Sequence, residues 1–260
     1  MYKNYFLFLF YILFFCGWLH AEEKKDNWNN FKSHEAIYNL KLGNITNSSK
    51  IHNASGQMHI TIKAVCDGWI INQNTTLDIT DKNGYQRRNV FRYSIWEANS
   101  HDMLRFMSKV IIDGEEFVAY EGESYIKNGV GNIIYTRPHN KVINIPLDTL
   151  YPMNHFFISL YKNKTGELFN YTVFTGEDDK SLNNVSTFTM DYLYEGISYK
   201  IIRSANYNYN YNYNLLKPEN EIEILVNPKT GVVQKVLFDY FDYKIIGVLK
   251  DVIYYNKPEC

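Results

Sequence analysis

The side chains suited to acid–base chemistry or metal binding lie far apart in this sequence of 260 residues. His34 and Glu35 begin like the zinc-binding pattern His-Glu-x-x-His, but position 38 is Tyr. That zinc site needs two histidines on one helical face, and the residues after His34 alternate as in a β-strand. Asp178 and Asp179 form an acidic pair without a second group of oxygen ligands nearby. This predicts a solvated turn in preference to a calcium site.

His155 follows Tyr151 by one helical turn beside a run of apolar residues. A lone histidine in this position favours a cap or a contact at the edge of a core. His34, Asp148 and His155 could meet after folding, as an enzyme acting on peptidoglycan or lipid would require. The sequence has no Gly-x-Ser-x-Gly motif, phosphate loop or dinucleotide fingerprint. We predict no catalytic residue, metal or cofactor, and keep an envelope-directed hydrolase or carrier enzyme as the alternative.

Three cysteines occur, and one of them, Cys260, is the last residue. Cys16 lies in a segment that we predict to be removed, which leaves Cys66 and Cys260. In an exported protein such a pair predicts a disulfide, with two unpaired thiols as the alternative. The bond would close a loop spanning most of the chain, which the chain-entropy account values at about 5 kcal/mol.

The first 21 residues have the layout of a secretory signal peptide. Lys3 precedes an apolar run over residues 5–19, and Ala21 precedes a charged segment. The run is shorter than the roughly 20 residues that span a bilayer, although an uncleaved membrane anchor remains the alternative. Cys16 does not indicate a lipoprotein, because two phenylalanines precede it where small residues belong. We predict export to the periplasm, with the protein at most peripheral to the membrane.

The remaining chain is long enough to bury a full core. Its formal net charge is −1 including the signal, and it has no basic stripe of the kind that binds nucleic acid. We predict a short lead over residues 22–33 and a single domain over residues 34–260.

Alternation of apolar and polar residues dominates this domain and predicts β-strands. Ala36, Tyr38, Leu40 and Leu42 share one face, and a turn is predicted at Asp67-Gly68. Beyond it, strands are predicted over residues 90–97, 103–112, 116–126, 131–137, 141–145, 168–174, 186–193, 197–205, 221–226, 232–240 and 243–254. Turn-forming residues separate them. The fold class is therefore mainly β, with one antiparallel sheet that is strongly curled or closed.

One segment, near residues 152–164, has helical spacing instead. Pro152 suits the first helical position, Gly166 suits the position after the last turn, and apolar side chains recur between them. Its apolar residues are Met153, Phe156, Phe157, Leu160 and Tyr161. This stripe must pack on or inside the sheet.

The alternating tyrosines and asparagines of residues 207–214 allow three interpretations. They could form an aromatic binding tract, a strand tip or a loop lengthened by repetition. We favour the loop.

Four stretches, taken in order, resemble the EipB-type cell-envelope-integrity family, an alphaproteobacterial family long classed as a domain of unknown function. They are HEAIYNLKL, ASGQMHITIKAVCDGWIINQ, IPLDTLYPMNHFFISLYKNKTGE and the Pro-x-Cys ending of FDYFDYKIIGVLKDVIYYNKPEC. The resemblance spans residues 34–260. It departs from the family pattern at Tyr151 and Met153, and at Thr175, where the family has Asp in a Phe-Asp-Gly motif.

The resemblance implies a periplasmic β-spiral or open barrel, shaped like the periplasmic lipoprotein carriers. It implies that Cys66 pairs with Cys260. It also implies a role in envelope integrity under stress, with no established enzymatic activity.

Two kinds of non-enzymatic partner fit these expectations: a lipid or lipoprotein, and an envelope protein. A curled sheet leaves a concave face, and apolar clefts are common ligand sites. The helix aromatics could line or plug that cleft, or fill a dry core. The candidate binding residues are His34, Trp69, His155 and Phe156.

Overall fold

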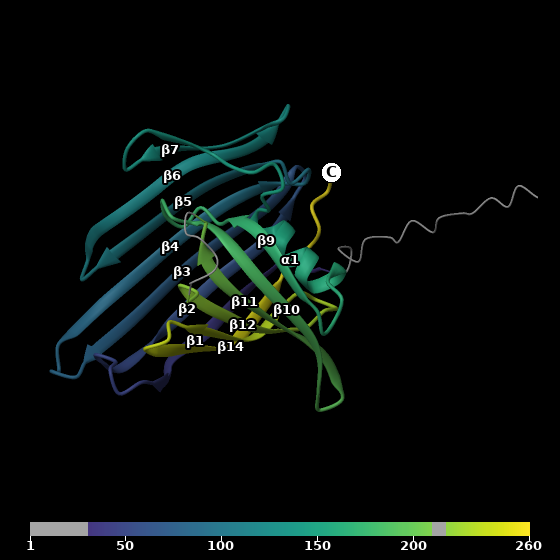
Figure 1. The fold of residues 1–260 in the computed structure, drawn as a ribbon. Coiled ribbons are helices and arrows are strands. Elements are labelled where there is room, and N and C mark those ends of the chain that lie inside the picture. Colours follow the sequence, from purple (N-terminus) through teal and green to yellow (C-terminus); the bar gives the residue numbers. More distant parts are fainter. Residues whose placement is uncertain (1–30, 210–216) are drawn as a thin grey trace, which may run out of the picture.

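The computed structural model describes residues 31–209 and 217–260 (Figure 1). The predicted signal peptide (1–21), most of the lead and residues 210–214 of the Tyr-Asn tract lie outside the described residues. Within the described ranges, fourteen strands form one antiparallel sheet in the order β8-β7-β6-β5-β4-β3-β2-β1-β14-β13-β12-β11-β10-β9. The prediction of a single antiparallel sheet is confirmed.

The strands are β1 His34–Ile45, β2 Ile51–Val65, β3 Gly68–Asp81, β4 Gln86–Ala98, β5 Met103–Ile112, β6 Glu115–Lys127, β7 Val130–Arg137, β8 Lys141–Asn144, β9 Leu168–Phe174, β10 Leu182–Tyr194, β11 Ile197–Asn208, β12 Asn220–Val226, β13 Val233–Asp239 and β14 Tyr243–Tyr254. Strands that are neighbours in sequence pair with each other, except β8 and β9. In addition, β14 returns to pair with β1 and so joins the two halves of the chain. The turn between β2 and β3 is Cys66-Asp67, one residue earlier than predicted.

The sheet is curled but not closed, because its edge strands β8 and β9 do not pair with each other. A short segment links the two edges instead: Leu150 bridges Val173 of β9, donating its N–H to Thr172 O and accepting from Phe174 N. Figure 1 shows β9 to β12 passing across the concave side of the broad wall formed by β2 to β6, with α1 at one end.

The predicted helix begins at Pro152 as expected but ends earlier than residue 164. The α-helix α1 covers Pro152–Phe157 and continues as one wide turn, η2, over Ile158–Lys162. Asn163 closes this turn by donating its N–H to Ile158 O at 2.8 Å, and its own backbone is extended. Gly166, predicted as the helix cap, has a φ of +85° and donates its N–H to Thr189 O. It therefore belongs to the following turn.

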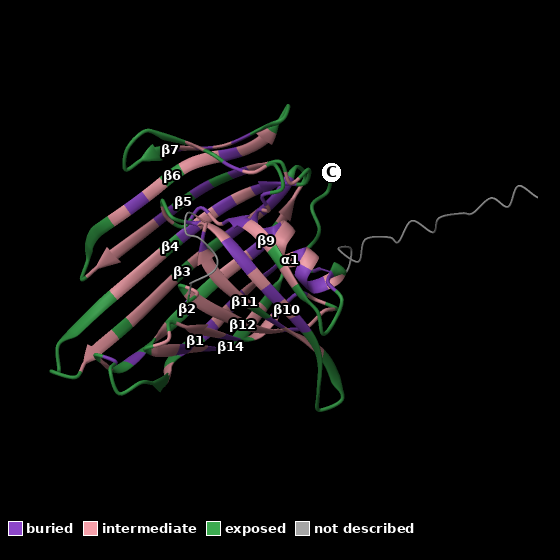
Figure 2. Ribbon diagram, in the orientation of Figure 1, coloured by how far each residue is buried: buried purple, intermediate pink, exposed green. Residues whose placement is uncertain are grey.

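The apolar stripe of the helix fills one end of the curled sheet. Met153, Phe157 and Leu160 are almost fully buried (Figure 2). Phe31, from the lead, packs edge-on against Phe157 and against Trp69 of β3, with ring centroids 5.3 Å apart in both pairs. This end of the molecule is a packed aromatic core. The apolar side chains of the helix therefore fill a dry core and do not line a cleft.

A buried carboxylate holds the helix in place. Tyr151 precedes α1 without a side-chain cap. Glu97 of β4 is 0% exposed and accepts the N–H groups of Met153 at 2.7 Å and Asn154 at 3.0 Å. His101 Nδ1 lies 2.8 Å from the same carboxylate. Because the first N–H groups of a helix lack intrahelical partners and carry partial positive charge, this carboxylate both satisfies and stabilises them.

A disulfide joins the chain end to the β2–β3 turn. Cys260 follows β14 and is bonded to Cys66, with the two Cα atoms 5.7 Å apart. It ties the end of the chain back to an early strand pair, and β14 already lies between β1 and β13.

The Glu97 contacts generate a prediction about stability. Glu97→Ala leaves two buried N–H groups without an acceptor and should lower the free energy of unfolding by about 3 kcal/mol. Glu97→Gln keeps one acceptor oxygen and should lower the free energy of unfolding by less. Urea unfolding followed by fluorescence measures both, with Glu115→Ala at the exposed start of β6 as the control. An alanine variant as stable as the control would contradict this role.

Candidate ligand-binding site

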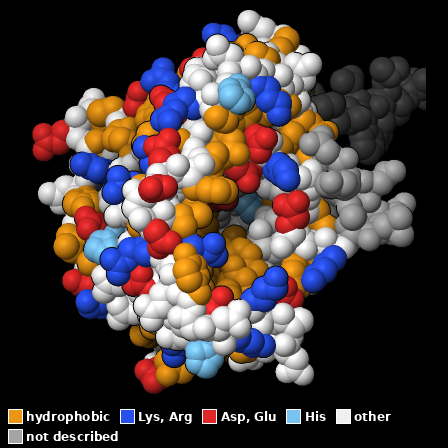
Figure 3. Space-filling model, turned by 90° about the vertical axis from the view of Figure 1, so that its left-hand side faces the viewer, with side chains coloured by type: hydrophobic (Ala, Val, Ile, Leu, Met, Phe, Trp, Pro, Cys, Tyr) orange, Lys and Arg blue, Asp and Glu red, His pale blue; other side chains and the backbone are white. Residues whose placement is uncertain are grey.

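The end of the sheet away from α1 contains a pocket of about 450 Å³. Strand β3 shows how the interior divides: Trp69 and Ile71 join the aromatic core, whereas Leu77 and Ile79, further along the same face, line the pocket. We call this pocket the cavity. Figure 3 shows this side of the molecule hollowed, with apolar side chains around the hollow and charged side chains around its rim. Its apolar wall includes Leu40, Met58, Leu77, Val110, Ile222 and Phe238.

The loop after β9 separates the core from the cavity. Three hydroxyl groups on the inner face of the sheet hold its backbone carbonyls. Tyr93 of β4 donates to Thr175 O, Ser108 of β5 donates to Glu177 O, and Tyr135 of β7 donates to Asp178 O at 2.9 Å. We call residues 175–178 the floor loop. These bonds fix its path across the interior of the sheet.

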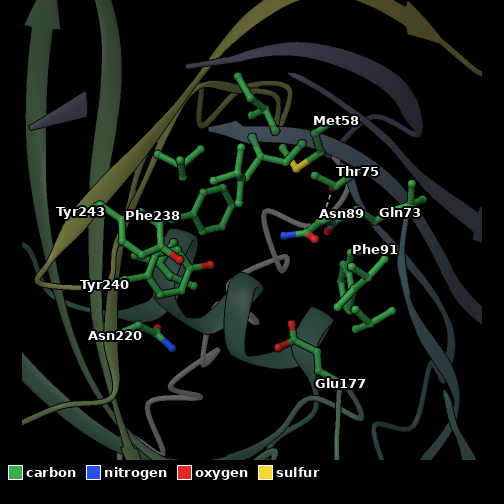
Figure 4. A pocket seen from close by; sticks show the side chains of 18 of the residues that line it. Met58, Gln73, Thr75, Asn89, Phe91, Glu177, Asn220, Phe238, Tyr240 and Tyr243 are labelled. Atoms are coloured by element: carbon green, nitrogen blue, oxygen red, sulfur yellow. Dashed lines mark hydrogen bonds between the residues drawn. The ribbon is translucent and has the colours of Figure 1, made fainter. Parts of the chain in front are cut away.

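Glu177 is the floor-loop residue whose side chain points into the cavity (Figure 4). In the described part of the chain, no hydrogen bond or ion pair engages its carboxylate. Water in the cavity reaches the side chain, but the surrounding walls replace most of the solvent around it. This burial, and secondarily the Asp178 carboxylate, raises the pKa of Glu177 to about 7.

Aromatic and amide side chains face Glu177 across the cavity. Tyr240 and Tyr243 stack with ring centroids 5.1 Å apart, and Figure 4 shows both hydroxyl groups pointing inward. Burial raises the pKa of both phenols, so they remain protonated at neutral pH. On the opposite wall, Gln73 Nε2 donates to Thr75 Oγ1 at 2.9 Å. The cavity is therefore an apolar pocket with a few placed polar groups, the usual composition of a small-molecule site.

The four candidate binding residues predicted from the sequence do not line the cavity. Trp69 and Phe156 both pack against Phe31 in the aromatic core. His34 is buried, with Nδ1 2.7 Å from Lys32 O. His155 has Nε2 2.9 Å from Thr187 Oγ1. These residues stabilise the closed end of the sheet.

The convergence considered for an enzyme does not occur. Asp148 lies exposed in the turn before α1, while His34 and His155 make their hydrogen bonds elsewhere. Over residues 31–209 and 217–260, no group of three or more His, Cys, Asp and Glu side chains is placed to hold a metal ion. No helix in those same ranges is long and apolar enough to span a bilayer.

Sequence reasoning missed Glu177 and the two tyrosines. Glu177 precedes the acidic pair at 178–179, which we interpreted as a solvated turn. Asp178 does form such a turn, since its Oδ1 accepts from Lys180 N at 2.8 Å. The available signal was the alternation of inward-facing residues on β3 and β4, which places side chains inside the sheet without showing whether they fill it.

Comparison with known proteins gives a family and a fold. A family model described as EipB-like matches residues 25–196. The crystal structure of a β-barrel-like protein of domain of unknown function DUF1849 from Brucella abortus superposes with a TM-score of 0.79 at 17% identity, covering 87% of this chain and 99% of that chain. No curated protein gives a significant match.

His155 generates a prediction about pH. Burial lowers its pKa to about 4, from an ordinary value of 6.5. The unfolded chain therefore binds a proton at this residue below pH 6.5, whereas the folded chain does not until about pH 4. The contribution of His155 to the free energy of unfolding is therefore largest above pH 6.5. It falls as the pH drops, by about 2 kcal/mol between pH 7.5 and pH 5.

His155→Gln removes this titration while keeping a group that can bond Thr187. Urea unfolding at pH 7.5 and pH 5 should show the variant losing about 2 kcal/mol less than the natural protein over that interval. His34, whose pKa burial also lowers, is present in both proteins and cancels in the comparison. Equal losses in the two proteins would contradict the assignment.

Proposed function

We propose that this chain, which belongs to the EipB-like family, is an exported binding protein without catalytic activity. It supports the cell envelope by holding the apolar part of a lipid or lipoprotein. The observation that carries this proposal is the cavity at the open end of the sheet. Its volume of about 450 Å³ falls within the range of roughly 300–1,000 Å³ typical of ligand sites.

Placement in the periplasm rests on two features of the chain. The first 21 residues have the layout of an export signal. The Cys66–Cys260 disulfide belongs to an oxidising compartment, because cytosolic thiols are kept reduced.

The polar groups of the cavity support binding over catalysis. A nucleophile needs a base within hydrogen-bond reach, and the base needs an orienting partner. Tyr240 and Glu177 face each other across the cavity, but no hydrogen bond between them is present in the described chain. The histidines considered above lie outside the cavity.

An envelope protein partner is a second candidate, favoured by the β10–β11 hairpin. Its tip exposes Leu193 by 72%, together with Tyr194 and Ile197, and Figure 2 shows the tip projecting from the body of the molecule. Exposed apolar groups gathered in this way often mark a contact surface. Such a partner is compatible with a ligand in the cavity, because the hairpin tip is not part of the cavity lining.

Binding of a neutral apolar probe tests the proposal. N-phenyl-1-naphthylamine should bind the full exported chain at one saturable site, with an increase in its fluorescence. Leu77→Lys places a charge in the cavity wall and should weaken binding about tenfold or more. Asn74→Lys, on the opposite face of the same strand, is the matched control and should bind normally. A probe that does not bind, or that binds both variants alike, would overturn the proposal.

A further inference from the structure

The charges around the cavity are unevenly placed. Its charged lining residues among those described are Glu177, Glu221 and Arg87. Arg87 is exposed, pairs across the sheet with the inward-facing Ile79 and acts electrostatically on Tyr243 of the cavity wall. Glu177 stands on the floor loop, facing the lumen. The described lining therefore carries two carboxylates against one guanidinium, so its net charge is negative.

We infer that the cavity recognises an amphiphile whose polar end is a positively charged ammonium group, and that this group lies against Glu177. The inference rests on the proposed function and names the ligand class for the same site. Its apolar chain would lie along Leu40, Met58, Leu77 and Ile222.

The first support is the unpaired carboxylate. The backbone on both sides of the Glu177 side chain is held, since Tyr93 bonds Thr175 O, Ser108 bonds Glu177 O and Tyr135 bonds Asp178 O. These bonds fix the backbone that carries the Glu177 side chain at the cavity. Glu177 is reached by solvent but lies among the cavity walls, and a carboxylate in such a partly desolvated place gains from pairing with a cation. An ammonium group supplies both the charge and, in a primary amine, the donors.

The second support is the aromatic wall. Phe91, Phe238, Tyr240 and Tyr243 all line the cavity. The Glu177 carboxylate acts electrostatically on Tyr240, and Figure 4 shows both side chains in the same cavity. Aromatic faces attract ammonium and quaternary ammonium groups by about 0.5–2 kcal/mol, and more strongly where water is excluded. A carboxylate with aromatic rings around it favours a cation over a neutral or anionic head group.

Three compounds with the same ten-carbon chain test the inference: decyltrimethylammonium, decanol and decanoate, each used below its micelle concentration. Each displaces N-phenyl-1-naphthylamine from the full chain at pH 8. We expect decyltrimethylammonium to bind about tenfold more tightly than decanoate. Tetramethylammonium, which has no chain, should displace no probe.

Glu177→Gln isolates the carboxylate. This variant should lose about tenfold in affinity for decyltrimethylammonium and keep its affinity for the neutral probe. Glu115→Gln, which removes one charge from the exposed start of β6, should change neither. Loss of cation preference in Glu177→Gln alone supports the inference. Decanoate binding as tightly as the cation, or a preference that survives in Glu177→Gln, overturns it.

The two proposals fail in different ways. If the neutral probe binds the natural protein but the cation has no advantage, the ammonium inference falls and the apolar binding function stands. If the neutral probe does not bind at all, the proposed function itself falls.

Discussion

The structure depends on the hydroxyl groups that hold the floor loop across the interior of the sheet. Tyr93, Ser108 and Tyr135 reach from three strands to carbonyl groups of residues 175–178. A curled sheet of this width would otherwise collapse onto one continuous core or stay open to solvent throughout. The inward face of β4 shows the resulting division: Phe91 lines the cavity, Tyr93 holds the floor loop, and Ile95 joins the aromatic core. A single strand therefore serves three environments through its two-residue period.

Below the floor loop, the interior is filled by the aromatic core. Glu97 binds the start of α1, and Phe31 packs into the space between Trp69 and the helix. Gly231 is required beside Phe31, because its φ is +76° and a Cβ there would lie 2.0 Å from the ring. Above the floor loop, the interior holds the cavity, and Glu177 is left without a partner in the described chain. This contrast is why we assign the closed end to stability and the open end to binding.

Much of the fold could be predicted from the sequence, because its strands alternate apolar and polar residues and are bounded by turn-forming residues. The predictions for residues 103–112, 168–174 and 243–254 match β5, β9 and β14. The start of the helix at Pro152 was predicted, but its end was not, because Asn163 accepts a hydrogen bond from Tyr171 of β9, which lies outside the helical pattern. The cavity could not be predicted for a related reason. Alternation places Leu77 inside the sheet, but only the path of the floor loop determines whether that interior is filled.

The central claim is that the floor loop leaves a ligand cavity between β3 and β12. Crystals grown with 11-bromoundecanol, a neutral chain with a bromine at its end, test it most directly. The account predicts an anomalous bromine peak inside the ring formed by Leu77, Ile222 and Phe238, which all line the cavity. A peak confined to the outer surface of the sheet, with ordered water in the cavity, would contradict it.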